Sequence, residues 1–303
     1  MRTARLFPAF FFLAFLVLPA GAQVAPAWLR DAFRLPVPAH PPETEAVILL
    51  DEQETRVNPK GVMTTAGRRA VKVLRDSGIG AASRLTVVSA YDTRVRDMTV
   101  WRLRTGRDPL KVTMKNVVET GLAPDTLYTD ISLKVLAIPE VETGDVIGYE
   151  WEMERKPASL EDVFAFQQGY PLFRGRYVMT LPSGWDVDAS WVNWTPREGP
   201  TAAAPSSPRV WTVTDVPAVD EEPMMPGRQS VTGRLVLRLK APGKDPRCFS
   251  GWTEVGAWYD ALTRECRVST SGIASDLTLT YRFRVPRYAK AAGGMMVVRP
   301  RIV

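Results

Sequence analysis

The sequence predicts an all-β protein: an antiparallel β-sandwich, built as one large sandwich or two in tandem, followed by one amphipathic helix and an irregular tail. Three observations favour this class. After residue 145, Ile147, Tyr149, Trp151 and Met153 alternate with glutamates, which is the period of a half-buried strand. Similar short segments recur along residues 46–239, separated by turn residues. The helical crossovers that parallel strands require do not occur between these segments.

The first 44 residues precede the expected sandwich. Residues 1–22 have a basic start at Arg2 and Arg5, an apolar run over 6–18 and small residues before Gln23, as in a secretory signal peptide. The apolar run is too short to span a bilayer, although an uncleaved anchor is the alternative. We therefore expect export to the periplasm or the extracellular space, with no transmembrane segment after cleavage. Five prolines make residues 23–44 an extended lead-in, with room for one short helical turn at 27–33.

The expected sandwich domain covers residues 45–249, with a soft boundary near residue 157 that separates either two sandwiches or two halves of one. Residues 142–145 form a turn, because Gly tolerates positive φ and Asp can bond its own backbone. The expected strands are residues 46–50, 68–74, 84–91, 98–103, 111–118, 127–136, 146–155, 163–168, 174–181, 185–194, 210–213 and 231–239.

Residues 250–267 are expected to form a connecting helix that Ser250 caps, with Trp252, Trp258 and Tyr259 on its apolar stripe. Such a helix would hold Cys248 and Cys266 about 27 Å apart, whereas bridged Cα atoms lie within about 7 Å. We therefore do not expect these two cysteines to form a disulfide with each other. In the irregular tail over residues 268–303, residues 277–285 alternate as one further strand would, and the part after Pro286 has no clear period.

The formal net charge of +6 does not describe the expected domain. Removing the two arginines of residues 1–22 and the six basic residues of 282–303 leaves −2 for residues 23–281. A nucleic-acid partner is therefore not expected.

The sequence contains few of the groups that carry catalysis. Its only histidine, His40, lies in the proline-rich lead-in, so neither a Ser–His–Asp nor a Cys–His arrangement is expected. No metal-binding motif and no phosphate-binding glycine loop occurs. We therefore expect no catalytic residue, no cofactor and no enzymatic activity.

Three groups of side chains are candidates for ligand binding, and each has a structural alternative. Glu150 and Glu152 lie about 6.7 Å apart on one strand face, near the separation of inverting glycosidases, or they belong to a solvated sheet face. Trp191, Trp194 and Trp211 form either an aromatic platform for a glycan or part of the core. The acidic residues 220–222 either bind Ca²⁺ or form a solvated turn.

The order of several motifs resembles the β-rich domain of unknown function that precedes transglutaminase-like domains in exported bacterial proteins. The matching segments are residues 46–52, 85–91, 129–131, 144–150, 171–182, 213–226 and the Trp252 helix. The strand Gly144-Asp145-Val146-Ile147-Gly148-Tyr149-Glu150 resembles one strand of that family, and the resemblance rests on the order in which these segments follow one another.

The resemblance implies a non-catalytic β-sandwich module that binds or scaffolds beside a transglutaminase-like domain. In that family the downstream domain supplies a catalytic cysteine in a Gly-Asp-Cys-Lys-like context. Cys266 stands between Glu265 and Arg267 and no histidine follows it, so no catalytic residue is carried over. The resemblance makes Trp252, Trp258 and Tyr259 the packing surface for that domain, and the tail a remnant of its start. A cell-envelope glycan or protein is the alternative partner, and a carboxylate-based carbohydrate-active enzyme is the alternative function.

Overall fold

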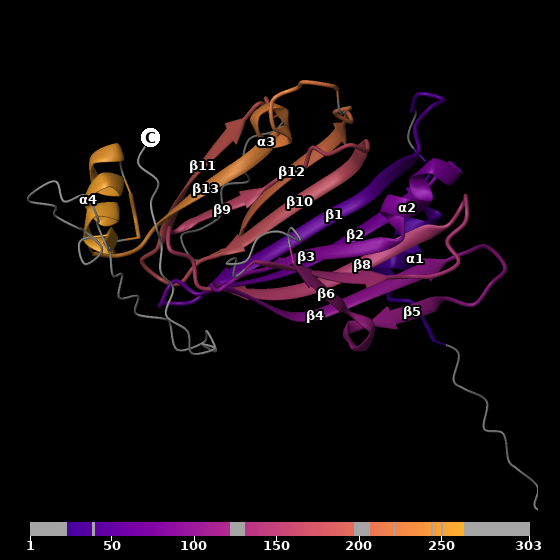
Figure 1. Ribbon diagram of the computed structural model, residues 1–303, viewed down its shortest axis with the longest axis horizontal. Coiled ribbons are helices and arrows are strands. Elements are labelled where there is room, and N and C mark those ends of the chain that lie inside the picture. Colours follow the sequence, from indigo (N-terminus) through magenta and orange to yellow (C-terminus); the bar gives the residue numbers. More distant parts are fainter. Residues whose placement is uncertain are drawn as a thin grey trace, which may run out of the picture.

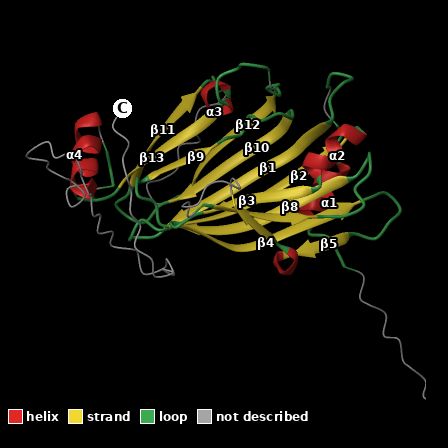
Figure 2. Cartoon of the chain, viewed as in Figure 1, coloured by secondary structure: helices red, strands yellow, loops and turns green. Residues whose placement is uncertain are grey.

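The computed structural model describes residues 23–37, 40–121, 131–196, 207–220, 222–243, 245, 247–249 and 251–263. Strands dominate this part of the chain and form two layers, as Figures 1 and 2 show. The predicted all-β sandwich is therefore confirmed. The expected signal peptide, the tail over residues 268–303 and Cys266 lie outside the described residues.

A seven-stranded sheet in the order β12-β10-β1-β2-β8-β4-β5 forms the large layer. Its strands are β1 (Ala46–Val57), β2 (Met63–Val73), β4 (Thr93–Leu103), β5 (Leu110–Thr113), β8 (Val146–Arg155), β10 (Leu172–Thr180) and β12 (Arg209–Val216). All neighbours are antiparallel except β1 and β10, which pair in parallel with Ile48 opposite Leu172. The parallel pair needs no helical crossover, because the chain between β1 and β10 runs through the rest of the sandwich. Strands from both sides of residue 157 thus share one sheet.

Two three-stranded sheets form the second layer (Figure 1). One contains β3 (Arg84–Ser89), β7 (Ser132–Ala137) and β6 (Val118–Gly121), in that order. The other contains β11 (Asp186–Val192), β13 (Arg234–Lys240) and β9 (Glu161–Phe164). The main core lies between the layers, where apolar residues from alternate strand positions meet. Phe164 and Phe166 pack there with Tyr177, which in turn contacts Trp211.

The helices are short. They comprise α1 (Ala27–Arg34), the 3₁₀ turn η1 (Asp76–Gly78), α2 (Ile79–Ala82), the 3₁₀ turn η2 (Met114–Asn116), α3 (Arg228–Val231) and α4 (Trp252–Thr263). None of the helices in the described part of the chain combines the length and hydrophobicity that spanning a bilayer requires.

Helix α1 lies within the lead-in and covers part of the outer face of the large sheet. Leu29 is fully buried in a second apolar cluster with Val47, Ala70 and Val146. A close approach is needed there: a Cβ on Gly148 would lie 2.4 Å from Leu29 Cδ2. The short helix expected at residues 27–33 is therefore present, and residues 29, 32 and 33 place its apolar stripe on the sheet.

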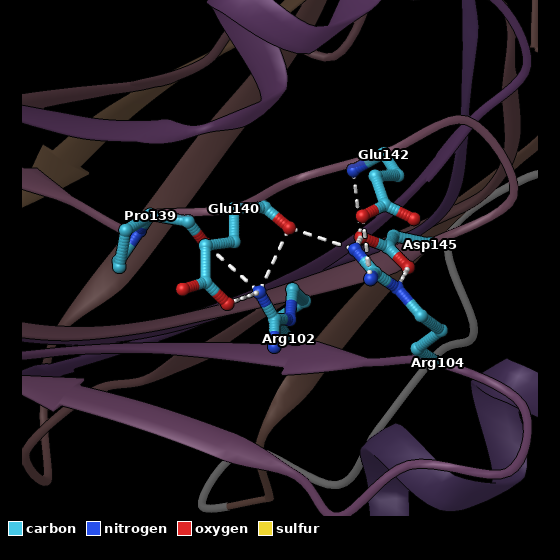
Figure 3. A network of polar contacts seen from close by, with 6 residues as sticks. All are labelled: Arg102, Arg104, Pro139, Glu140, Glu142 and Asp145. Atoms are coloured by element: carbon cyan, nitrogen blue, oxygen red, sulfur yellow. Dashed lines mark hydrogen bonds and ion pairs between the residues drawn. The ribbon is translucent and has the colours of Figure 1, made fainter.

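A network of ion pairs and hydrogen bonds connects the turn before β8 to the end of β4, as Figure 3 shows. Arg104 binds both oxygens of the buried Asp145, at 2.7 and 2.8 Å, and this pairing raises the pKa of Arg104. Arg102 donates to the backbone oxygen of Glu140 at 2.8 Å. Gly144 has φ +97° and Glu140 has φ 55°, so the turn uses left-handed backbone at two positions. The predicted turn over residues 142–145 is therefore present, and ion pairs and hydrogen bonds connect it to β4.

Helix α4 stands at one end of the sandwich, beyond β11 and β13 in Figure 1. It occupies the centre of the predicted helix over residues 250–267, and residues 264–267 lie outside the described residues. Trp252 is 88% exposed and Tyr259 is 62% exposed, while the Trp258 ring stacks edge-on against Phe249 at 5.5 Å. Cys248 is a free, half-buried thiol that donates to the backbone oxygen of Leu239.

Candidate functional site

A cleft of about 620 Å³ opens between the two small sheets. Its walls are the strands β3 and β9, and its floor is the inner face of β1, β2 and β8. The cleft exists because β3 and β9 end their sheets and do not pair with each other, so the large sheet between them is not covered. Strand alternation points Gln53, Thr65, Arg69, Tyr149 and Trp151 toward this space.

Arg69 is the central charge of the floor. It donates to Asp51 Oδ2 at 2.8 Å and to Gln168 Oε1 at 3.2 Å, and its guanidinium lies 5.9 Å from the Trp151 ring centroid. The Trp151 ring crosses Gly67, where a Cβ would lie 2.1 Å from the ring. Asp51 is fully buried, and its Oδ1, like Arg69 Nε, has no partner among the described residues. The floor therefore holds a neutralised ion pair beside an aromatic ring.

Asp162 on β9 is bonded through both oxygens. Its Oδ1 accepts from Arg155 at 2.7 Å and from the Val163 N–H at 3.0 Å. Its Oδ2 accepts from the hydroxyl of Thr55 at 3.2 Å and from the hydroxyl of Tyr177. Burial, and then the nearby Asp162 carboxylate, raises the pKa of Tyr177 well above its ordinary value.

Tyr149 is also held as a neutral phenol. Its hydroxyl donates to the backbone oxygen of Ala82, and burial raises the pKa of Tyr149 well above its ordinary value. A phenol that stays protonated through neutral pH is a poor general base. Tyr149 and Tyr177 therefore stay protonated through neutral pH, and each donates its hydroxyl to a group of the protein itself.

The predicted glutamates belong to the outer face of the large sheet. Glu150 and Glu152 lie on this face of β8, as the alternation predicts, beside a second groove of about 510 Å³. Glu150 accepts from the indole of Trp28 at 2.9 Å and from the indole of Trp101 at 3.0 Å. Glu150 thereby ties α1 to β4. Glu152 lies opposite Asp97 and Ala66 in the strand register.

The predicted tryptophans lie in or against the main core. Trp191 and Trp194 each pack edge-on against Phe166, at 5.7 and 5.3 Å between ring centroids. Trp211 is only 3% exposed and contacts Tyr177 at 6.1 Å. The three indoles therefore do not present one common exposed face. Within the described residues there is also no group of three or more His, Cys, Asp or Glu side chains placed to hold a metal ion.

Sequence reasoning did not single out the residues of the cleft. One signal was available: Arg69 shares its inward row with Val71 and Val73, so a charge falls where the strand pattern expects an apolar side chain. The partners of Arg69 come from distant strands, which no local pattern brings together.

The fold and the cleft define this chain as a β-sandwich module with a ligand-sized cleft. The chain belongs to the DUF3857 family, a domain of unknown function, whose model matches residues 59–220. A comparison with curated proteins finds no match.

Among solved structures, a candidate protease from Parabacteroides distasonis is 13% identical, with a TM-score of 0.54 over 64% of this chain and 40% of that chain. The match concerns the fold alone, and the chain spans less than half of that protein. An M1 zinc metallopeptidase from Deinococcus radiodurans is 11% identical over 64% of this chain and 42% of that chain, with a TM-score of 0.31. That score is too low to support a comparison of function.

Proposed function

We propose that the chain is an exported, non-catalytic β-sandwich module that binds or scaffolds beside a transglutaminase-like domain. The observation that carries the proposal is the state of its best-placed carboxylates. Asp162 and Glu150 each have both oxygens bonded by groups of the protein itself. A general acid or nucleophile needs a carboxylate that can reach a substrate. Asp162 instead holds β9 at the wall of the cleft, and Glu150 ties α1 to β4 on the opposite face of the large sheet.

Helix α4 supports the scaffolding part of the proposal. Trp252 and Tyr259 expose large aromatic surfaces at the end of the sandwich, and exposed apolar patches of this kind mark contacts with other domains. The candidate protease also extends well beyond the matched region. A transglutaminase-like domain packed on α4 would bury these rings.

Activity assays test the non-catalytic part. Purified chain starting at Gln23 is assayed for peptidase, transglutaminase and glycosidase turnover, with Glu150→Gln and Cys266→Ser as matched variants. We expect no turnover above the buffer control in any of the three proteins. Robust turnover by the wild type that either single substitution abolishes would refute the proposal.

A glycan is the second candidate ligand, favoured by the aromatic ring of Trp151 beside the polar Gln53 and Thr65. Tryptophan fluorescence is titrated with peptidoglycan fragments on the wild type, Trp151→Phe and the core variant Trp191→Phe. Binding in the cleft predicts a saturable signal that Trp151→Phe removes and Trp191→Phe keeps. Loss of the signal in Trp191→Phe alone would place the glycan outside the cleft.

A further inference from the structure

The backbone of β3 is bonded on one side only. The N–H of Ile138 donates to the Ser83 oxygen at 2.9 Å. Ser83 and Ile138 are opposite each other, next to the paired residues Arg84 and Ala137. In an antiparallel pair such bonds recur at every second residue, so Leu85 and Val87 bond β7. Arg84, Thr86 and Val88 therefore direct their N–H and C=O groups away from β7. No described residue pairs with β3 on that side within its sheet.

This free side of β3 borders the cleft. All five residues from Arg84 to Val88 line it, although Leu85 and Val87 turn their side chains into the core. Consecutive residues can line one space only when the strand presents its edge rather than a face. The outward N–H and C=O groups of β3 are thus available to a chain that enters the cleft.

The opposite wall is closed by its own side chains. The bond from Leu239 N–H to the Leu160 oxygen shows by the same alternation that Glu161 and Val163 face the cleft. Arg155 donates to the Glu161 oxygen at 3.1 Å, and the Val163 N–H donates to Asp162. The Glu161 N–H is bonded to Ser159. Of the two edges, β3 is therefore the receptive one.

Charge decides what kind of chain β3 would accept. Three arginines line the cleft, and Asp51 and Asp162 already neutralise Arg69 and Arg155. Arg84 is exposed and has no acidic partner among the described residues. Val88 lies four residues after Arg84 on the same face of β3. It is 50% exposed and offers an apolar contact.

We propose that β3 binds an extended peptide by strand addition in the cleft, with an acidic side chain of the peptide beside Arg84. The proposal rests on the proposed binding role of the cleft but not on the absence of catalysis. Main-chain hydrogen bonds would supply the affinity, and Arg84 and Val88 would supply the preference among sequences. The edge of β3 borders a cleft, which shields it from pairing with another copy of the protein. Strand addition gives this shielded edge a role, because an extended peptide can still enter the cleft.

The test uses a capped, fluorescent peptide of six residues, the length of β3, in which Thr and Val alternate around one Glu. Binding of this peptide to the protein is measured by its fluorescence anisotropy. Thr86→Pro removes a donor that faces the cleft without removing a bond to β7, and Thr86→Val keeps that donor. We expect Thr86→Pro to weaken binding by about tenfold or more and Thr86→Val to leave it unchanged. Equal binding by the two variants would refute strand addition.

Two further arms leave the fold of the protein untouched or nearly so. Two further peptides are methylated on their backbone nitrogens, one at the odd and one at the even positions. We expect only one of these two peptides to lose binding to the wild type, because only one set of N–H donors faces β3. A peptide with Lys in place of Glu is expected to bind more weakly to the wild type, and Arg84→Ala is expected to remove that preference. Binding of both methylated peptides would overturn the proposal. So would an Arg84→Ala variant that prefers the Glu peptide over the Lys peptide as strongly as the wild type does.

The outcome also separates this proposal from the broader one. A wild-type chain that binds no peptide but still binds peptidoglycan fragments through Trp151 would refute the assignment to β3 and keep the binding role. A chain that binds neither would refute strand addition and the binding role of the cleft together.

Discussion

The contact between Leu29 and Gly148 predicts a strong coupling between two substitutions. Leu29→Ala removes a fully buried side chain from α1, and such changes cost about 2–5 kcal/mol of unfolding free energy. Leu29 lies on the outer face of the large sheet under one short helix that can shift to fill part of the space, so we expect a value of about 2–3 kcal/mol. Gly148→Ala places a methyl group 2.4 Å from Leu29 Cδ2. Overpacking of this kind costs about 1–3 kcal/mol.

The double variant should be less destabilised than the sum of the two. Once Leu29 is an alanine, the methyl group at position 148 no longer clashes and fills part of the space that the leucine left. We expect a favourable coupling of about 1–3 kcal/mol, measured by urea unfolding of the wild type, both single variants and the double variant. Leu239→Ala, in the other core cluster, is the control partner for Gly148→Ala and should be additive. Additivity of Leu29→Ala and Gly148→Ala within about 0.5 kcal/mol would show that α1 does not pack as described.

Three further outcomes are expected. Trp28→Phe leaves Glu150 Oε1 without its indole donor and should cost about 1–2 kcal/mol in urea unfolding, whereas an unchanged midpoint would contradict the bond between α1 and β8. The raised pKa of Tyr177 stabilises the fold fully below the unfolded pKa near 10.0, and this stability is lost as the pH rises toward the folded pKa. Stability should thus fall by up to ~1.4 kcal/mol per pH unit above that point, and Tyr177→Phe should flatten the slope. Arg69→Leu strands the buried Asp51 and should cost about 3 kcal/mol, partly recovered in a double variant with Asp51→Asn.

Most of the strands could be predicted from the sequence because their alternation is local, but the expected strand over 111–118 is wrong: it is divided into β5, the 3₁₀ turn η2 and the start of β6. The rows Ile147–Tyr149 and Leu235–Leu237–Leu239 face the core as the pattern predicts. The last strand begins later than expected, at Arg234, because the side chain of Gln167 binds the Gly233 N–H and α3 occupies the preceding residues. A side chain distant in sequence decides that boundary, so periodicity does not locate it.

The site was harder to predict for the same reason. That Glu150 faces outward follows from the pattern, but its two indole partners come from α1 and β4, at positions far along the chain. The cleft likewise depends on which strands end their sheets, and sheet order is a property of the whole fold. The parallel pairing of β1 with β10 is a further case, since nothing near Ile48 in the sequence indicates Leu172 as its partner.

This pairing has a consequence for how the protein is made. When β1 leaves the ribosome, β2 soon follows and can cover one of its sides, but the other side waits for β10. Contacts between such distant segments form slowly, and an uncovered strand in the meantime is a template for aggregation. A nascent chain stalled before Leu172 would therefore expose the middle of its own largest sheet, and chaperone capture should be strongest in that interval of synthesis.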